Sequence, residues 1–237
     1  MVRQCADKYR VRKYVKELGF GDSLIPLIAS YDHAEQIQWN ALPDTFVLKW
    51  NFGCGMNIVC QDKSAWNQED VICRMQKWDK NDDYLMHGEL QYNCQHKILV
   101  EKYLRPEHGG LPADYKVYCF NGKPLAILFI DGRATVGQTA AFFDTNWQFL
   151  SETGKGAYVK FQEHPDAPRF LQKMLDASSK LSQPFEFVRI DFYEVDNHLY
   201  FGEMTFTPAG GFFTSQCKID GKTMGEILKI STDEHVG

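Results

Sequence analysis

The residues that most clearly suggest a chemical function lie in two predicted strands near the C-terminal end, residues 187–195 and 198–206. If a three-residue loop centred on Asn197 joins these strands, Asp191 lies directly opposite Glu203, and both side chains project from one face of the sheet. Opposed carboxylates repel each other unless a cation lies between them, so the pattern indicates a cation site. A solvated polar face remains the alternative, because any half-buried strand alternates in this way and a two-residue turn would break the register.

Alternation along the first of these strands also assigns its two faces. Val188, Ile190 and Phe192 are expected to fill the core, whereas Arg189 shares the polar face with Asp191. The sequence therefore predicts that the positively charged side chain of Arg189 lies beside the two carboxylates.

Two further pairs of charged residues follow or interrupt apolar strands. Glu101 and Lys102 lie in the predicted strand 97–104, and Asp114 and Lys116 fall on one face of the next strand. Each pair has an ordinary alternative, since charged residues mark strand ends and surface ion pairs are common.

A glycine-containing loop follows another apolar strand, in the segment FVLKWNFGCGMN at residues 46–57. Gly53 and Gly55 would let backbone N–H groups approach a phosphate, and Lys49 would supply a positive charge. The loop lacks the GxxxxGK[ST] pattern of a P-loop, and a simple hairpin turn is the alternative.

The elements that must position these residues mix helices and hairpins. We expect helices at 7–18, capped by Asp7, at 32–39, around 71–78 and at 168–181. Further strands are expected at 46–50, 58–60, 115–120 and 125–131, the last two joined through Asn121-Gly122. Without regular βαβ alternation, this order favours an α+β fold.

Composition narrows the class of protein. The 237 residues suffice for one large or two small domains, and a net charge of −5 argues against a general nucleic-acid binder. None of the seven cysteines forms a CxxC pair, which favours reduced thiols, and no apolar run approaches the ~20 residues of a membrane span. We therefore expect a cytoplasmic protein with no membrane span and no nucleic-acid partner.

Read in order, these segments resemble an ATP-grasp enzyme of the TupA-like type, which is linked to teichuronopeptide and surface-polysaccharide synthesis. The resemblance is carried by residues 7–15, 42–60, 98–104, 114–124 and 188–211, which span nearly the whole chain in the family's order. It implies an ATP-grasp fold of two α+β subdomains with a nucleotide bound between their sheets. The expected divisions are 1–24 for a leading helix, 25–103 for a small lid subdomain with the glycine loop, and 104–237 for the C-terminal core with the metal site.

The resemblance assigns several residues to the phosphates and ribose of ATP. Lys8 resembles the first phosphate-binding lysine of the superfamily and Lys49 the second, with residues 51–57 as the glycine loop over the triphosphate. Asp114 and Lys116 resemble the ribose- and phosphate-side positions of ribosomal-protein glutamate ligases.

The adenine-binding hinge of the superfamily is similar to the segment EKYL at residues 101–104. The resemblance places Glu101 and main-chain groups of the hinge, including Lys102 and Leu104, against the amino group and ring nitrogen of adenine.

The magnesium ligands of the superfamily resemble Asp191 and Glu203, the pair that the hairpin pattern singles out independently. Thr205 stands where the superfamily usually has an asparagine, so a hydroxyl replaces an amide oxygen and leaves the number of Mg²⁺ ions open, one or two. Only six residues precede Asp7, and we expect the acceptor site to be incomplete, rebuilt, or supplied by a partner protein or a second copy.

The activity implied by the resemblance is ATP-dependent joining of a carboxylate to an amine through an acylphosphate. The expected substrates are an amino acid and a uronic acid of a surface or capsular polysaccharide. Arg189 is expected either to hold the transferred phosphate or to offset the repulsion of the carboxylates, and Arg133 to hold the acceptor carboxylate or to end a solvated loop.

Three alternatives remain on the sequence alone. A kinase would use the same nucleotide site on a sugar hydroxyl, and a non-enzymatic module would bind ATP or polysaccharide without turnover. A glycosyltransferase of polysaccharide synthesis would need an Asp-x-Asp at a strand end, whereas this chain has Glu194-Val195-Asp196 on a predicted turn.

Overall fold

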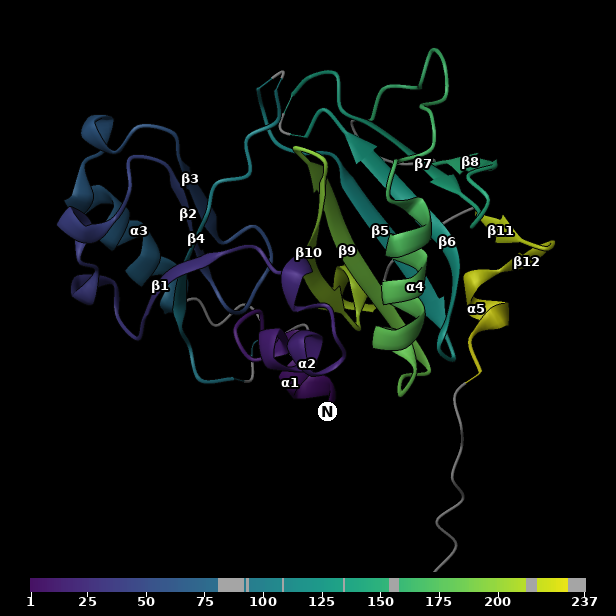
Figure 1. Cartoon of the computed structure of the whole chain (residues 1–237), viewed down its shortest axis with the longest axis horizontal. Helices are drawn as coiled ribbons and strands as arrows, with labels where there is room; N and C mark the ends of the chain where they lie inside the picture. Colours follow the sequence, from purple (N-terminus) through teal and green to yellow (C-terminus); the bar gives the residue numbers. More distant parts are fainter. Residues whose placement is uncertain are drawn as a thin grey trace, which may run out of the picture. The chain divides into compact units, whose positions relative to one another are not determined.

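The computed structural model describes residues 1–80, 92, 94–107, 109–133, 135–153, 158–211 and 217–229. The chain forms two compact units, Met1–Leu104 and Arg105–Gly237 (Figure 1). Both combine helices with antiparallel sheets, so the predicted α+β class is confirmed. The finer division into a leading helix, lid and core stays a prediction.

The first unit is built on a four-stranded antiparallel sheet of order β1-β4-β2-β3. Its strands are β1 (Leu27–Tyr31), β2 (Phe46–Trp50), β3 (Asn57–Cys60) and β4 (Ile98–Glu101). The helices are α1 (Val2–Ala6), α2 (Val11–Glu17) and α3 (Gln68–Asp79), and short 3₁₀ turns lie at Gly21–Ser23, Ala34–Gln36, Trp39–Ala41 and Lys63–Ala65.

Alternation along β2 explains how this sheet presents Lys49. Phe46, Leu48 and Trp50 are buried in the core beneath α3, so Lys49 projects from the opposite face. Trp50 ties the sheet to that helix, because its indole Nε1 donates to the backbone oxygen of Met75 at 3.1 Å.

The N-terminal region differs from the predicted single helix. The Asp7 carboxylate accepts from the backbone nitrogens of Tyr9, at 2.8 Å, and Arg10, at 3.0 Å, which holds residues 8–10 in a turn. The helix therefore begins only at Val11, and the separate helix α1 precedes Asp7. Elsewhere in this unit, β4 ends at Glu101 instead of reaching 104, and the predicted helix at 32–39 is two short 3₁₀ turns.

The second unit contains a six-stranded antiparallel sheet of order β10-β9-β5-β6-β7-β8. Its strands are β5 (Asp114–Phe120), β6 (Lys123–Asp131), β7 (Thr139–Phe143), β8 (Phe149–Glu152), β9 (Phe187–Val195) and β10 (His198–Thr205). Beside the sheet lie α4 (Leu171–Ser182), a 3₁₀ segment at Pro208–Gly211, the small strands β11 (Lys218–Ile219) and β12 (Lys222–Thr223), and α5 (Met224–Ile227). Both predicted hairpins are confirmed, whereas β1, β7 and β8 were not predicted.

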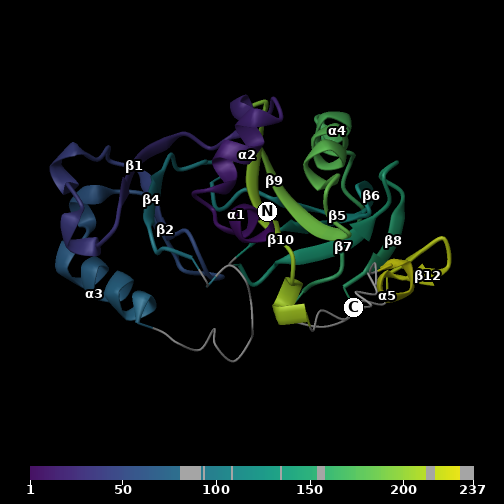
Figure 2. The same cartoon turned by 90° about the horizontal axis from the view of Figure 1, so that it is seen from below.

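Different elements cover the two faces of the six-stranded sheet (Figures 1 and 2). Helix α4 packs on the face of Cys119, whose thiol bonds to Ser182, and it buries Met174 and Leu181 there. The opposite face has an apolar end, where Tyr118, Phe120 and Phe142 pack against the segment that carries α5. Its other end carries the charged residues described below.

Within the described part of the chain, no helix is long and apolar enough to cross a membrane.

Candidate active site

The β9–β10 hairpin brings Asp191 opposite Glu203, but not by the predicted three-residue loop. The turn has two residues, Asp196 at φ 51° and Asn197 at φ 57°, so Val195 pairs with His198. A β-bulge between Phe201 and Glu203 then shifts the register by one residue. The expected loop is therefore wrong, while the expected opposition of the two carboxylates is present because the bulge restores it.

The bulge depends on a glycine. A Cβ atom added at Gly202 would lie 3.0 Å from ring carbon Cε2 of Tyr193 and 3.1 Å from the backbone oxygen of Asp191. Since backbone atoms beside Asp191 cannot easily yield, a side chain at this position would disturb the strand that holds both carboxylates.

Gly202→Ala is accordingly expected to lower the free energy of unfolding by about 1–3 kcal/mol, measured by chemical denaturation. Gly225→Ala is the matched control, because a Cβ there would meet no atom within 4 Å, and it should leave stability the same or higher. Equal stability of the two variants would contradict this account of the bulge.

Asp191 is the centre of an ion-pair network on this face. This residue is only 1% exposed, and its carboxylate accepts from Arg189, with Nε 2.7 Å from Oδ1 and Nη2 2.8 Å from Oδ2, and from Lys116 Nζ. Arg189 Nη2 also reaches Glu203 Oε1 at 3.3 Å and donates to Thr205 Oγ1 at 3.0 Å. Burial alone would lower the pKa of Arg189, but the carboxylates of Asp191 and Glu203 raise it above its ordinary value, so the guanidinium stays charged.

The network continues through Asp114 on the neighbouring strand. Lys116 Nζ lies 3.2 Å from Asp114 Oδ2, and Arg133 Nη1 lies 2.7 Å from the same oxygen. Burial raises the pKa of Asp114, while Lys116 and Arg133 oppose that rise. We call Arg133, Asp114, Lys116, Asp191, Arg189 and Glu203 the charged cluster; its three cations and three carboxylates alternate and balance formally.

Asp191 and Glu203 fit a magnesium ion of the kind that also binds phosphate. Mg²⁺ in phosphate-transferring sites takes one or two protein carboxylates and completes its shell with water and phosphate oxygens. The Thr205 hydroxyl donates to Glu203 Oε1 at 3.2 Å and could supply a neutral oxygen. Among the residues described, no cluster of three or more His, Cys, Asp or Glu side chains could hold a metal, so a cation here depends on water or phosphate for its other ligands.

In the first unit, Lys49 and Glu101 meet across adjacent strands. Glu101 pairs with Val47, two residues from Lys49, and Lys49 Nζ lies 2.6 Å from Glu101 Oε2. Arg12 of α2 approaches the other oxygen, Oε1, at 3.3 Å. Glu101 is thus a buried carboxylate held by two cations. Arg12 was not predicted as a site residue, although it lies in the same 7–15 segment as Lys8.

Lys8 contacts the glycine loop directly. Its Nζ donates to the backbone oxygen of Gly53 at 2.7 Å, and its backbone nitrogen donates to Asn51 at 2.9 Å. Gly53 and Gly55 have φ values of +72° and +71°, which only glycine adopts without strain. A lysine and a glycine loop separated by 45 residues are therefore joined in one place, as a phosphate site requires.

The remaining hinge residues, Lys102 and Leu104, occupy different environments. Lys102 is exposed and its backbone nitrogen donates to the oxygen of Pro26 at 3.0 Å, whereas Leu104 is buried. The structure thus groups Lys8 with Gly53 and Lys49 with Glu101 in the first unit, and joins Arg133, Asp114, Lys116, Asp191, Arg189, Glu203 and Thr205 in the second.

A family model matches the sequence, and solved structures match the fold. The family model described as TupA-like ATPgrasp matches residues 2–229. A crystal structure of D-alanine–D-alanine ligase from Bacillus anthracis matches with a TM-score of 0.50 and 17% identity, covering 85% of this chain and 57% of that one.

Two further solved structures match at lower TM-scores. The Bacillus anthracis ligase complexed with ATP gives 0.49 at 14% identity, covering 85% of this chain and 53% of that chain. The ATP-grasp ligase PsnB, complexed with a phosphomimetic variant of its minimal precursor, Mg and ADP, gives 0.47 at 10% identity, covering 91% and 55%. No curated protein matches the sequence significantly.

The chain spans a little over half the length of the ligases whose structures it matches. The family model, in contrast, covers nearly the whole of it, from residue 2 to residue 229. The predicted fold is confirmed, and the chain belongs to the TupA-like ATP-grasp family.

Proposed function

We propose that this protein is an ATP-dependent carboxylate–amine ligase that forms an amide through an acylphosphate. The observation that carries the proposal is the opposition of Asp191 and Glu203 within a balanced set of cations, in a chain of the ATP-grasp family. Catalysis of phosphoryl transfer is largely positioning and charge neutralisation, and a buried network of this kind supplies both.

When bound, ATP supplies the phosphoryl group and Mg²⁺ neutralises its oxygens, held by Asp191 and Glu203 with Thr205 beside them. Lys8 and Lys49 bind the phosphates of ATP. The backbone N–H groups around Gly53 and Gly55, in the glycine loop, bind the same phosphates. Lys102, Leu104 and Glu101 belong to the adenine-binding hinge. Because the Glu101 carboxylate is already paired with Lys49, we expect main-chain groups of the hinge, and not this carboxylate, to bind adenine.

Arg189 acts as a positioning residue for the two carboxylates. Its guanidinium bridges Asp191, Glu203 and Thr205, so it offsets the repulsion that would otherwise separate them. Lys116 and Arg133 both form ion pairs with Asp114, which supports a role for Asp114 in orienting Lys116 toward the nucleotide. Arg133 is the outermost cation of the cluster, with 37% of its side chain exposed, and is therefore the residue that would bind an acceptor carboxylate.

The proposed reaction has two steps. A substrate carboxylate oxygen attacks the γ-phosphorus, the bond to the β-phosphate oxygen breaks, and ADP leaves. The amine nitrogen then attacks the acyl carbon of the acylphosphate, phosphate leaves with its electron pair, and the nitrogen loses a proton. The substrate class, an amino acid joined to a uronic acid of a surface polysaccharide in the cytoplasm, rests on the family.

A coupled assay of ADP and free phosphate tests this function. We expect ADP and phosphate in equal amounts only when a carboxylate and an amine are both present, screened as pairs of uronic acids and amino acids with MgATP. ADP formed without free phosphate, together with a phosphorylated sugar, would identify a kinase and overturn the ligase proposal.

A further inference from the structure

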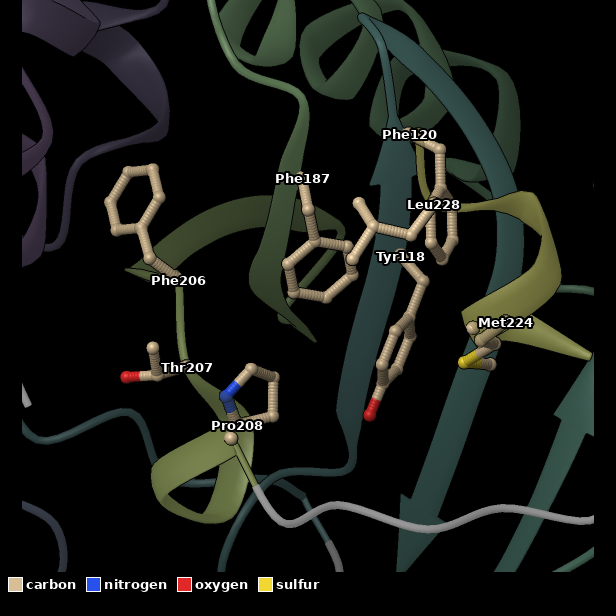
Figure 3. A pocket seen from close by; sticks show the side chains of 10 residues that line it. Tyr118, Phe120, Phe187, Phe206, Thr207, Pro208, Met224 and Leu228 are labelled. Atoms are coloured by element: carbon tan, nitrogen blue, oxygen red, sulfur yellow. The ribbon is translucent and has the colours of Figure 1, made fainter. Parts of the chain in front are cut away.

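A cavity of about 260 Å³ lies on the second unit, on the same face of the sheet as the charged cluster. Figure 3 shows the side chains of Tyr118, Phe120, Phe187 and Leu228 gathered around a common space. Met224, Phe206 and Pro208 also belong to the apolar lining. Among the described residues that line the cavity, none carries a formal charge.

Strand register explains why these side chains converge. Tyr118 pairs with Arg189 and Phe120 pairs with Phe187, and opposed residues share a face of the sheet. The lining is therefore the apolar continuation of the strands that carry the charged cluster. Leu228 approaches from the segment that includes α5 and packs against the same apolar core.

Two residues of the lining, Tyr118 and Phe206, adjoin the charged cluster or its neighbour Thr205. Tyr118 is two residues from Lys116 along β5, so both side chains lie on one face of the sheet, and the Tyr118 hydroxyl interacts with Arg189. Thr205, whose hydroxyl accepts from Arg189, leads directly into Phe206 of the lining. A ligand seated here would have its apolar part among the rings and its polar end next to the charged cluster.

The lining selects the chemistry of such a ligand. A dry cavity of about 150 Å³ lined by apolar side chains holds benzene, so this one has room for an aromatic ring and its linking carbons. A sugar ring would bury several hydroxyls against side chains that offer few hydrogen-bond partners, which is costly. The cavity suits an apolar side chain and disfavours the uronic acid.

We propose that this cavity binds the apolar, preferably aromatic, side chain of the amino-acid substrate. The inference rests on the proposed ligase function, and it makes the cavity the determinant of which amino acid is used. A chain with a charged amino-acid substrate would instead need a cation or carboxylate in this lining.

Direct binding tests the inference without turnover. We expect calorimetric titration of the full chain to detect L-phenylalanine and L-leucine, with L-aspartate and L-lysine at least about tenfold weaker. Leu228→Ala removes part of the lining and should weaken L-phenylalanine binding about tenfold. Ile227→Ala is the matched control, because Ile227 packs against the same apolar core but is not among the lining residues, and it should bind as wild type does.

A parallel titration with a non-hydrolysable ATP analogue separates the two proposals. Nucleotide binding with no preference for apolar amino acids, or an equal effect of Leu228→Ala and Ile227→Ala, overturns the cavity's role and leaves the ligase proposal standing. Selective binding of L-phenylalanine without nucleotide binding supports the cavity and counts against the ligase. Circular dichroism of both variants identifies a loss of fold, and in that case Leu228→Val replaces Leu228→Ala in the same comparison.

Discussion

The double substitution Asp191→Asn/Glu203→Gln is expected to abolish the magnesium-dependent part of ATP-analogue binding, a loss of about 100-fold or more in affinity. An amide is a poorer ligand for a hard cation than a carboxylate, and both carboxylates that would hold the ion would lose their charge. The weaker binding measured without Mg²⁺ should change little, since Lys8 and Lys49 lie in the other unit. Calorimetric titration in both conditions measures the two components.

The control for this prediction lies in the same hairpin. Asp196→Asn makes the same chemical change at an exposed turn residue, and asparagine tolerates its positive φ of 51°. It should bind the analogue as wild type does. Glu203→Gln alone guards against misfolding, because Glu203 is 31% exposed and makes a longer contact with Arg189. Full magnesium dependence in a folded double variant would contradict the assigned metal site.

Glu101→Ala should lower the free energy of unfolding of the first unit by about 3–5 kcal/mol. The carboxylate is 5% exposed at its side chain and is the partner of both Lys49 and Arg12, which are themselves 15% and 14% exposed. Removing it leaves two poorly solvated cations close together without a counter-charge. Tryptophan fluorescence during denaturation reports mainly this unit, since Trp39, Trp50, Trp66 and Trp78 lie within it and only Trp147 lies in the second unit.

An exposed ion pair of the same unit provides the comparison. Glu17→Ala breaks the pair with Lys13, whose side chains are 59% and 76% exposed at 3.6 Å, and should cost about 0.5 kcal/mol or less. If Glu101→Ala lowered the free energy of unfolding no more than Glu17→Ala, the buried ion pairs of Glu101 would not stabilise the first unit, and this prediction would be contradicted.

The hairpin illustrates both what the sequence could predict and what it could not. Alternation assigned Val188, Ile190 and Phe192 to the core, and all three are buried. The predicted partner of Asp191 was also right, but its basis was wrong, because the structure has a two-residue turn and a bulge at Gly202, where a Cβ would clash with the Tyr193 ring and the Asp191 backbone oxygen. No local pattern distinguishes Gly202 in a bulge from a glycine in a regular strand.

Contacts over long sequence distances account for the other differences. Lys8 meets Gly53, and Arg12 meets Glu101, across separations that periodicity does not encode. The strands β7 and β8 escaped prediction because β7 is buried and carries no alternation, while β8 is short. Turns with a strong local signal, such as Asn121-Gly122, were predicted correctly, with φ values of 48° and 75°.

The central claim is that this chain binds ATP with magnesium through its own ATP-grasp residues. Calorimetric titration of wild-type protein with a non-hydrolysable ATP analogue, with and without Mg²⁺, tests it most directly. We expect one saturable site whose affinity for the analogue rises markedly when Mg²⁺ is added. A folded protein that shows no binding in either condition would contradict the nucleotide site and the ligase function that depends on it.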